Sequence, residues 1–340
     1  MKVDYYLPPT AGATGAPSQV AKAAAAGFDG VFTADTGHEP FLPIAAGAAA
    51  GPGLEFGTAI AVAFPRSPMV TAMTAWDLQA MTGGRFLLGL GTQVRGHIVR
   101  RFSTEWGSPG PRLREYVGAL HAIWETFREG VPLRFDGDFY RFSLMTPFFN
   151  PGPIPHPDPK VFISAVGPYN CRLVGELCDG IHIHPFHTVG YLRDHVVPLV
   201  AEGAALAGRS VTDIQFASTV ICVTGADDEA MASSFAAARE QIAFYASTPS
   251  YRAVLESEGW DVGPELSALG ARQRWDEMTR LVSDEMVERV AVVAPLDRLG
   301  DAIRARYEGV LDRVGHYTLG GSLDHLGPEA WANLVEDTRG

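Results

Sequence analysis

Continuous runs of apolar residues alternate along the chain with segments whose apolar positions recur every three or four residues. Continuous runs are typical of strands that are covered on both faces, and the longer period is typical of helices packed on one side. The runs predict eight strands, at residues 3–7, 30–34, 55–61, 86–90, 161–165, 180–184, 215–223 and 314–319. The helical pattern falls between them, at 17–26, 41–50, 69–81, 112–128, 170–178, 189–206 and 227–246.

Repeated alternation of strand and helix predicts a parallel sheet with right-handed crossovers. Eight such units favour a (β/α)8 TIM barrel, an α/β fold, over an open doubly wound sheet. We therefore expect one domain over residues 1–340. In such a barrel the functional site lies at the carboxyl ends of the strands.

Two segments interrupt the alternation. Residues 132–159 predict a short hairpin at 133–142, followed by a proline-rich stretch that excludes regular structure. Residues 247–296 predict short helices at 264–271 and 275–283. We expect both to be insertions at the C-terminal face of the barrel, because long insertions there usually shape or cover the site.

Composition narrows the function. The chain has 46% hydrophobic and 19% charged residues, as folded globular proteins do, and its formal net charge is -12. This charge gives no support to nucleic-acid binding. No apolar run reaches a membrane-spanning length, and the first residues read as a strand and not as a signal peptide. The cysteines, Cys171, Cys178 and Cys222, form no CxxC motif, so a reducing cytoplasm is expected.

Glycines mark the end of the fourth predicted strand. Gly89 and Gly91 resemble part of a dinucleotide-binding turn, but the next glycine is Gly96, and no acidic residue ends a following strand. We therefore favour a strand end at which a flat ring approaches the backbone.

Three histidines end the sixth predicted strand. His182 and His184 share one face of that strand, so the pair could bind zinc, as in hydrolase barrels. That class carries its pair on the first strand, so we expect no metal. A structural role is the favoured one for His182, while His184 and His187 would donate hydrogen bonds to oxygens or a phosphate of a ligand.

Two further segments carry candidate chemistry. The loop after the second strand holds Asp35, His38 and Glu39, which are candidate general acids and bases. Asp35 or Glu39 could instead cap the helix that begins near Phe41. The basic segment 94–101, which includes His97, could receive an anionic ligand or form a solvated helix face.

Five segments together carry a family likeness. They are AGFDGVF at 26–32, GTAIAVAF at 57–64, GGRFLLGLG at 83–91, DGDFY at 136–140 and GELCDG at 175–180. In this order and spacing, over about residues 1–320, the chain resembles the bacterial-luciferase-like superfamily of flavin and deazaflavin oxidoreductases. Within it, the chain is most similar to members that depend on coenzyme F420.

The resemblance implies a cofactor ring at the carboxyl-terminal mouth of the barrel. It also implies a bulge at the end of the third strand, often with a non-proline cis peptide, that supports one face of the ring. The phosphate side of the cofactor would lie by the fifth and sixth strand ends. The residues that this places around the cofactor are Thr58, Ala59, Ile60, Gln93, His97, Ala165, Val166, Gly167, His184 and His187.

The function that the resemblance implies is hydride transfer between C5 of F420 and a small, apolar or planar organic substrate. The alternative is a monooxygenase that uses reduced FMN and oxygen, and a metal-dependent hydrolase is the second alternative. Phe41, Phe64 and Phe186 would line the substrate pocket, and a homodimer is expected. Several deazaflavin relatives have a histidine directly after the acidic residue of the second strand. Here Thr36 stands there, so Asp35, His38 and Glu39 all remain candidates for the acid–base residue.

Overall fold

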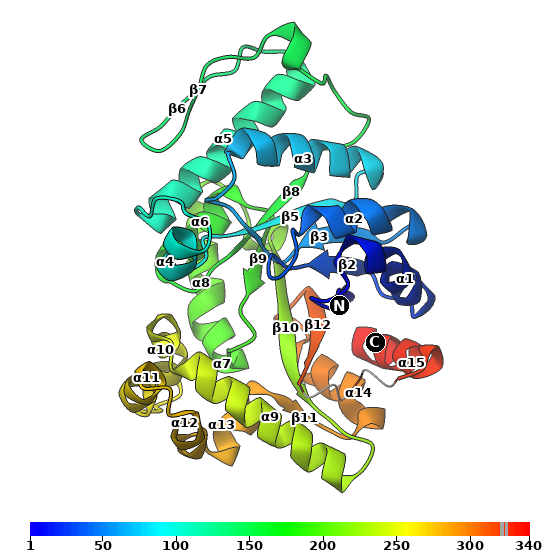
Figure 1. Cartoon of the computed structure of the whole chain (residues 1–340), viewed down its shortest axis with the longest axis vertical. Coiled ribbons are helices and arrows are strands. Elements are labelled where there is room, and N and C mark those ends of the chain that lie inside the picture. Colours follow the sequence, from blue (N-terminus) through cyan, green and yellow to red (C-terminus); the bar gives the residue numbers. More distant parts are fainter. Residues whose placement is uncertain (320–322, 324–325) are drawn as a thin grey trace.

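A closed barrel of parallel strands forms the centre of the computed structural model, which describes residues 1–319, 323 and 326–340 (Figure 1). Around the barrel the strands are β1 (Lys2–Tyr6), β2 (Gly30–Thr33), β3 (Glu55–Thr58), β5 (Phe86–Gly91), β8 (Lys160–Ser164), β9 (Gly180–Ile183), β10 (Gln215–Val223) and β12 (Arg313–Thr318). Pairing of β9 with β10, of β10 with β12 and of β12 with β1 closes the ring. The predicted TIM barrel is confirmed, and each predicted strand corresponds to one of these.

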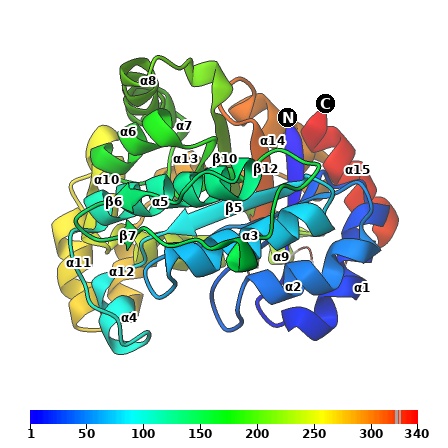
Figure 2. The ribbon, with the colours of Figure 1, turned by 90° about the horizontal axis from the view of Figure 1, so that it is seen from above.

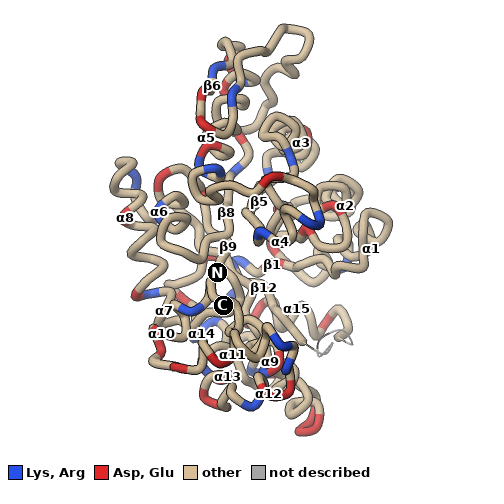
Figure 3. The backbone as a smooth tube through the Cα atoms, turned by 60° about the vertical axis from the view of Figure 1, so that its left-hand side comes forward, with Lys and Arg blue, Asp and Glu red and all other residues tan. Residues whose placement is uncertain are grey.

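Helices cover the outside of the barrel between successive strands (Figures 1 and 2). The main ones are α1 (Gly12–Ala25), α2 (Phe41–Gly47), α3 (Pro68–Met81), α5 (Pro109–Glu129), α6 (Pro168–Leu177), α8 (Val197–Leu206), α9 (Asp228–Ala246) and α14 (Leu296–Tyr307). The last helix, α15 (Pro328–Arg339), packs against α14. Charged residues of both signs are interspersed along these helices (Figure 3). Within the described part of the chain, no helix is long and apolar enough to cross a membrane.

The helix expected at 189–206 differs from the prediction. It consists of α7 (Val189–Tyr191), a π-helical turn, η3 (Leu192–Val196), and α8. Pro198 lies in the first turn of α8 and has no backbone N–H to continue the helical hydrogen-bond pattern. The hydrogen-bond pattern therefore changes just before this proline, although the chain keeps its direction.

The first insertion lies along the outer wall. It leaves the end of α5 and returns at β8, and the predicted hairpin is present as β6 (Phe135–Asp136) and β7 (Arg141–Phe142). The Glu115 carboxylate of α5 accepts hydrogen bonds from the backbone N–H groups of Asp138 and Phe139 at 2.9 and 2.8 Å. The hairpin is therefore fastened beside α5, as Figure 2 shows.

The second insertion is built from short helices. They are α10 (Arg252–Ser257), α11 (Gly263–Ala271), α12 (Trp275–Leu281) and α13 (Asp284–Val290), and the single turn Pro249–Tyr251 precedes them. Between α13 and α14, the short strand β11 (Val292–Val293) pairs with β10. Of the two insertions, this one reaches the carboxyl-terminal mouth of the barrel.

Apolar side chains close the interior of the barrel. Phe32, Leu87, Phe162 and Ala217 are buried there as one cluster, referred to below as the barrel plug, and Tyr6 and Ala59 pack against it. Space for a ligand therefore remains on one side of the plug, toward the carboxyl ends of the strands.

Candidate active site

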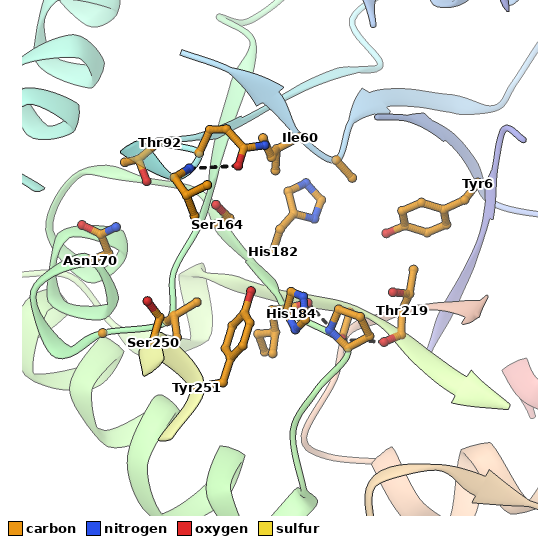
Figure 4. A pocket seen from close by; sticks show the side chains of 18 residues that line it. Tyr6, Ile60, Thr92, Ser164, Asn170, His182, His184, Thr219, Ser250 and Tyr251 are labelled. Atoms are coloured by element: carbon orange, nitrogen blue, oxygen red, sulfur yellow. Dashed lines mark hydrogen bonds between the residues drawn. The ribbon is translucent and has the colours of Figure 1, made fainter. Parts of the chain in front are cut away.

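A cavity of about 600 Å³ opens at the carboxyl ends of the strands (Figure 4). Residues from β1, β3, β5, β8, β9 and β10, or from the loops directly after them, line it together with the second insertion. They are Tyr6, Ala59, Ile60, Thr92, Gln93, Val94, Ser164, Val166, Gly167, Asn170, His182, Ile183, His184, Pro185, Ser218, Thr219, Ser250 and Tyr251. Its size is within the range of roughly 300–1,000 Å³ that small-molecule and cofactor sites occupy.

A cis peptide joins Ala59 and Ile60 on the cavity wall. The chain leaves β3 at this point, before β4 (Ala61–Val62) pairs with β5. The backbone N–H of Ala59 donates to Thr33, and the carbonyl of Ile60 accepts from the backbone N–H of Asp35 at 3.0 Å. The predicted cis peptide is confirmed, while its role as a support for a ring stays a prediction.

Asp35 is part of the wall and does not line the cavity. Its carboxylate accepts from the backbone N–H of Val62 at 3.1 Å and pairs with Arg66 at 2.6 Å. The side chain of Asp35 is only 5% exposed, so this ion pair is largely shielded from water. Asp35, in the loop after β2, therefore connects this loop to Val62 and Arg66 in the segment after β3, which follows Ile60.

Glu39 and His38 also lie away from the cavity lining. The Glu39 carboxylate accepts from the backbone N–H groups of Phe41 and Leu42 at the start of α2, so it caps that helix, and its other oxygen faces Arg66 at 3.3 Å. The ring of His38 packs against Gly12. The structure thus brings Asp35 and Glu39 together on Arg66, and His38 stands apart from them.

Thr58 of β3 and the glycines of β5 allow these two strands to approach each other closely. The Thr58 hydroxyl donates to the Gly89 carbonyl at 2.7 Å and accepts from the Gly89 N–H at 3.0 Å. A Cβ at Gly89 would lie 1.8 Å from the Thr58 carbonyl oxygen, and one at Gly91 would lie 2.7 Å from the Ile60 side chain. The space that these glycines leave is therefore filled by protein atoms. The residues directly after them, Thr92 and Gln93, line the cavity, and a ring contact at this strand end stays a prediction.

Gln93 reaches the cavity and His97 does not. Gln93 has a positive φ of 56°, and its side-chain oxygen accepts from the backbone N–H of Val94 at 2.9 Å. His97 lies on α4 (Arg95–Arg100), exposed to solvent, beside the basic residues Arg95 and Arg100. α4 begins directly after Val94, which lines the cavity, while Arg95 and Arg100 are not part of the lining.

The loop after β8 leads directly into helix α6. Val166, Gly167 and Asn170 line the cavity, while Ala165 is buried in the core. Gly167 is the residue before α6, and Pro168 opens the helix. The first turn of α6 therefore presents free backbone N–H groups and the positive end of the helix dipole at the cavity, as anion sites require.

His184 faces the cavity as a neutral ring. Tyr251 of the second insertion stacks on it with 4.3 Å between ring centroids. Burial and, to a smaller extent, the nearby His187 lower the pKa of His184 to about 3. Since Nδ1 accepts from the backbone N–H of Phe186 at 3.1 Å, the proton of the neutral ring is on Nε2, which is then a donor.

Four other residues that were predicted for the site lie behind the residues that line the cavity. His187 is buried, with Nδ1 donating to the carbonyl of His184 at 2.8 Å, and burial lowers its pKa to about 4. Phe186 is buried beside Tyr251. Phe41 packs under Arg66, and Phe64 packs under Arg112, so neither borders the cavity. These residues support the wall.

Tyr6 and His182 form the closed end of the cavity, which the sequence analysis did not foresee. His182 lies against Phe32 and Phe162 of the barrel plug. Burial lowers its pKa to about 3, aided by the charge of Arg313 and opposed by the nearby Thr58 carbonyl. Its Nε2 is buried without a hydrogen-bond partner among the described residues. Tyr6 stacks on Phe32, and Figure 4 shows its hydroxyl directed toward His182.

The sequence contains one signal for these residues. Tyr6 and Ser164 occupy the last positions of their strands, and at Ser164 the apolar run of β8 becomes polar. Ser218 and Thr219 lie inside the long strand β10, whose run continues beyond them. The pairing register of β10 with β9 and β12 brings them to the mouth, and one sequence does not reveal that register. In the described part of the chain no group of three or more His, Cys, Asp or Glu could hold a metal ion.

A parallel barrel with a neutral, hydroxyl-rich cavity at its carboxyl end is the architecture of a barrel enzyme for a small organic ligand. Residues 3–313 match the sequence model of the luciferase-like monooxygenase family, and the chain belongs to this family. It is 47% identical over 306 residues to the uncharacterised protein Rv1360 of Mycobacterium tuberculosis, covering 88% of this chain and 90% of that protein. It is 31% identical over 302 residues to the putative coenzyme F420-dependent oxidoreductase Rv3520c of the same organism, covering 82% and 84%.

Solved structures share the fold. The F420-dependent tetrahydromethanopterin reductase of Methanopyrus kandleri matches with a TM-score of 0.78 at 17% identity, over 99% of this chain and 98% of that one. The FMN-bound oxygenating component of a diketocamphane monooxygenase of Pseudomonas putida matches with a TM-score of 0.71 at 15% identity, over 99% and 97%. Since its relatives and neighbours include F420-dependent oxidoreductases and flavin monooxygenases, the chain is an enzyme of the oxidoreductase class.

Proposed function

We propose that this protein is an F420-dependent oxidoreductase that moves a hydride between the deazaflavin and a small organic substrate. The observation that carries the proposal is the cavity at the strand ends, walled by the cis peptide Ala59–Ile60, in a chain 31% identical to a putative F420-dependent oxidoreductase. When bound, F420 accepts or donates a hydride at C5. The tasks of the protein are to orient the ring, exclude water and handle the accompanying proton.

The residues present fit this cofactor. The cavity is large enough for a tricyclic ring, and Ala59 and Ile60 form an apolar surface on which one ring face would lie, with Gln93 at its edge. Val166, Gly167 and Asn170 would face the phosphate at the start of α6, where free N–H groups favour an anion. Arg95 and Arg100 of α4 follow the lining residue Val94 in the chain, and we propose that the acidic tail of F420 leaves the cavity on this side.

Proton handling falls to groups inside the cavity. Asp35 and Glu39 are occupied with Arg66 and helix α2, and His38 packs outside, so we assign them to support of the wall. His184 presents an Nε2–H group to the cavity, with its ring fixed by Phe186 and Tyr251. We propose that this imidazole donates a hydrogen bond to the cofactor or the substrate.

Direct titration tests the choice of cofactor. Purified protein is titrated with F420 and, separately, with FMN, with binding followed by the change in cofactor fluorescence. We expect F420 to bind at least about tenfold more tightly than FMN, a difference of about 1.4 kcal/mol. Tight FMN binding without F420 affinity would replace the proposal with the flavin monooxygenase alternative.

A charge substitution tests the phosphate position. Asn170→Asp places a negative charge at the start of α6, inside the cavity lining, and should weaken F420 binding by about tenfold or more. Arg172→Ala is the matched control: it makes the same change in net charge on the same helix, but Arg172 pairs with Glu202 at 2.7 Å, outside the cavity. Equal effects of the two variants would contradict a phosphate site at α6.

A further inference from the structure

The second insertion covers one side of the cavity with its first turn. Ser250 and Tyr251 of this turn line the cavity, and Tyr251 extends beside His184 on the wall (Figure 4). The two rings are stacked, with 4.3 Å between their centroids and 24° between their planes. Helix α10 begins at Arg252, directly after Tyr251. The position of the tyrosine ring therefore depends on how α10 is held.

A buried carboxylate fastens the far end of α10. Glu258 directly follows this helix, and its side chain is only 8% exposed. One carboxylate oxygen accepts from the hydroxyl of Thr188, in the loop after β9, and the other accepts from the guanidinium of Arg289 on α13. The Thr188 hydroxyl in turn accepts from the backbone N–H of Tyr191 at 3.1 Å. Glu258 thus joins two helices of the insertion to the strand loop that also carries His184.

The near end of the turn is held separately. The hydroxyl of Ser267 on α11 donates to the carbonyl of Ser247 at 2.7 Å. At the far end, Thr188 is 2% exposed, so loss of the Glu258 carboxylate would leave a buried hydroxyl without this acceptor. A mostly buried carboxylate likewise needs partners of this kind, because its desolvation is costly if it stays unpaired. Both sides of the contact therefore favour the docked position of α10.

We propose that Glu258 is a positioning residue, which holds α10 on the loop after β9 and thereby keeps Tyr251 stacked on His184. This inference rests on the proposed function, in which His184 donates a hydrogen bond to the cofactor or the substrate. The His184 ring is fixed at its Nδ1 edge by the backbone N–H of Phe186 and on one face by Tyr251. Without the stacked ring, water reaches that face and the imidazole gains freedom to turn, so its Nε2–H is no longer held toward the cavity.

Titration of His184 reports its surroundings. Among the described residues, the titratable groups that face this ring are His187 of the same loop, Tyr245 of α9 and Tyr251. Burial raises the pKa of both phenols, so neither ionises between about pH 4.5 and 7.5. Burial is also the main cause of the low pKa of His184, about 3. Entry of water beside the ring should therefore raise this pKa.

NMR of the protein with ¹³C-labelled histidine measures the effect, without any cofactor. Between about pH 7.5 and 4.5, we expect His184 of the wild type to stay neutral. In Glu258→Ala its pKa should rise by at least about two pH units toward the ordinary value. The resonance of His184 is assigned from its absence in a His184→Asn variant.

Two variants and one other histidine serve as controls. Glu256→Ala removes the same charge from the same helix, at an exposed position, and should leave His184 unchanged. Glu258→Gln keeps an oxygen that accepts from Thr188, so it should largely retain the wild-type titration. His316, which packs against α15, shows by an unchanged titration that the barrel is folded. Equal responses to Glu256→Ala and Glu258→Ala, or no response to Glu258→Ala with His316 unchanged, overturn the proposal.

A double-mutant cycle shows whether Glu258 acts through the stacked ring. Tyr251→Leu removes that ring and should raise the pKa of His184 as Glu258→Ala does. The double variant should then match Tyr251→Leu alone, because no stacked ring is left to lose. Fully additive effects would mean that Glu258 acts on His184 by another path and would overturn the positioning role.

Cofactor titration separates this inference from the proposed function. Wild-type protein that does not bind F420 refutes the proposed function, even where the NMR titration shows that Glu258 controls the surroundings of His184. Wild-type protein that binds F420, with His184 unresponsive to Glu258→Ala, refutes only the role of Glu258.

Discussion

At the scale of single residues, the cavity wall is held by polar groups that do not enter it. Asp35 links the loop after β2 to the segment after β3 through the backbone N–H of Val62 and through Arg66. Thr58 joins β3 to β5 by two hydrogen bonds with Gly89. Carboxylates and hydroxyls at strand ends are therefore ambiguous signals, since the same residue types serve catalysis and support.

Substitution of Asp35 separates these two roles. Asp35→Ala leaves the partly buried Arg66 without its main partner and frees the Val62 N–H, so we expect the free energy of unfolding to fall by about 3 kcal/mol. Binding of F420 should weaken as well, because Ile60 loses its support. Urea unfolding and cofactor titration measure the two effects. Loss of turnover with full stability and full cofactor affinity would instead show that Asp35 is a catalytic residue.

Glu39→Ala is the matched comparison. Glu39 contacts the same arginine at the longer distance of 3.3 Å, its side chain is 39% exposed, and it caps α2. We expect a loss of about 1 kcal/mol, the usual value of a helix cap. A loss as large as that of Asp35→Ala would mean that helix capping, and not the ion pair, dominates the stability of this loop.

At the scale of elements, strands were easier to predict than the small helices. Each barrel strand is an apolar run because both of its faces are covered, so its pattern is independent of its neighbours. The short helices α4, α10 and α13 have six or seven residues and depend on tertiary packing, which a local pattern does not show. The interruption before Pro198 also depends on how one turn accommodates a missing N–H.

The candidate site could be predicted in part for the same reason. Strand ends locate the mouth, and so Ala59, Gln93, Gly167 and His184 were correctly placed near one another. Which side of the wall a loop residue faces depends on its partner, and the partner of Asp35 is Arg66, distant in sequence by 31 residues. Long-range pairing of this kind is absent from a local pattern.

A buried ion-pair group joins three strands below the plug. Arg313 of β12 makes a bidentate pair with Asp4 of β1 at 2.6 and 2.8 Å and also contacts Glu55 of β3. Arg313 and Asp4 are each 1% exposed at the side chain. The group fixes the register of strands that are distant in sequence, at the end of the barrel opposite the cavity.

Removal of one partner should cost more than removal of both. Arg313→Met leaves Asp4 buried without its counter-charge, so we expect a loss of about 3–5 kcal/mol of unfolding free energy. Adding Asp4→Asn, which removes that isolated charge, should recover part of the loss. A double-mutant cycle by urea unfolding measures the coupling. Simple additivity of the two single effects would show that the pair contributes no net interaction.

At the scale of the whole molecule, several histidines are buried in the neutral form. Burial is the main cause that lowers the pKa of His182 to about 3 and that of His187 to about 4. The same side chains titrate near 6.5 in the unfolded chain. Between these values the unfolded state binds more protons than the folded state, so folding stability rises with pH in this window. The stabilisation is complete above about pH 6.5 and is lost as the pH falls toward 4.

The His187→Asn variant tests this dependence at one position. Asparagine can keep the hydrogen bond that Nδ1 of His187 donates to the His184 carbonyl, but it does not titrate. The variant pays a packing cost at pH 7.5, and the informative quantity is the slope of unfolding free energy against pH, measured by urea unfolding at several values from 7.5 to 4.5. One histidine contributes at most about 1.4 kcal/mol per pH unit, so between pH 6 and 4.5 the variant should lose stability less steeply than the wild type by up to that amount. Parallel curves for the two proteins would mean that His187 binds its proton as readily in the folded state as in the unfolded state. The buried ring beside Tyr307 would then need a water-filled space around Nε2 to solvate the charge.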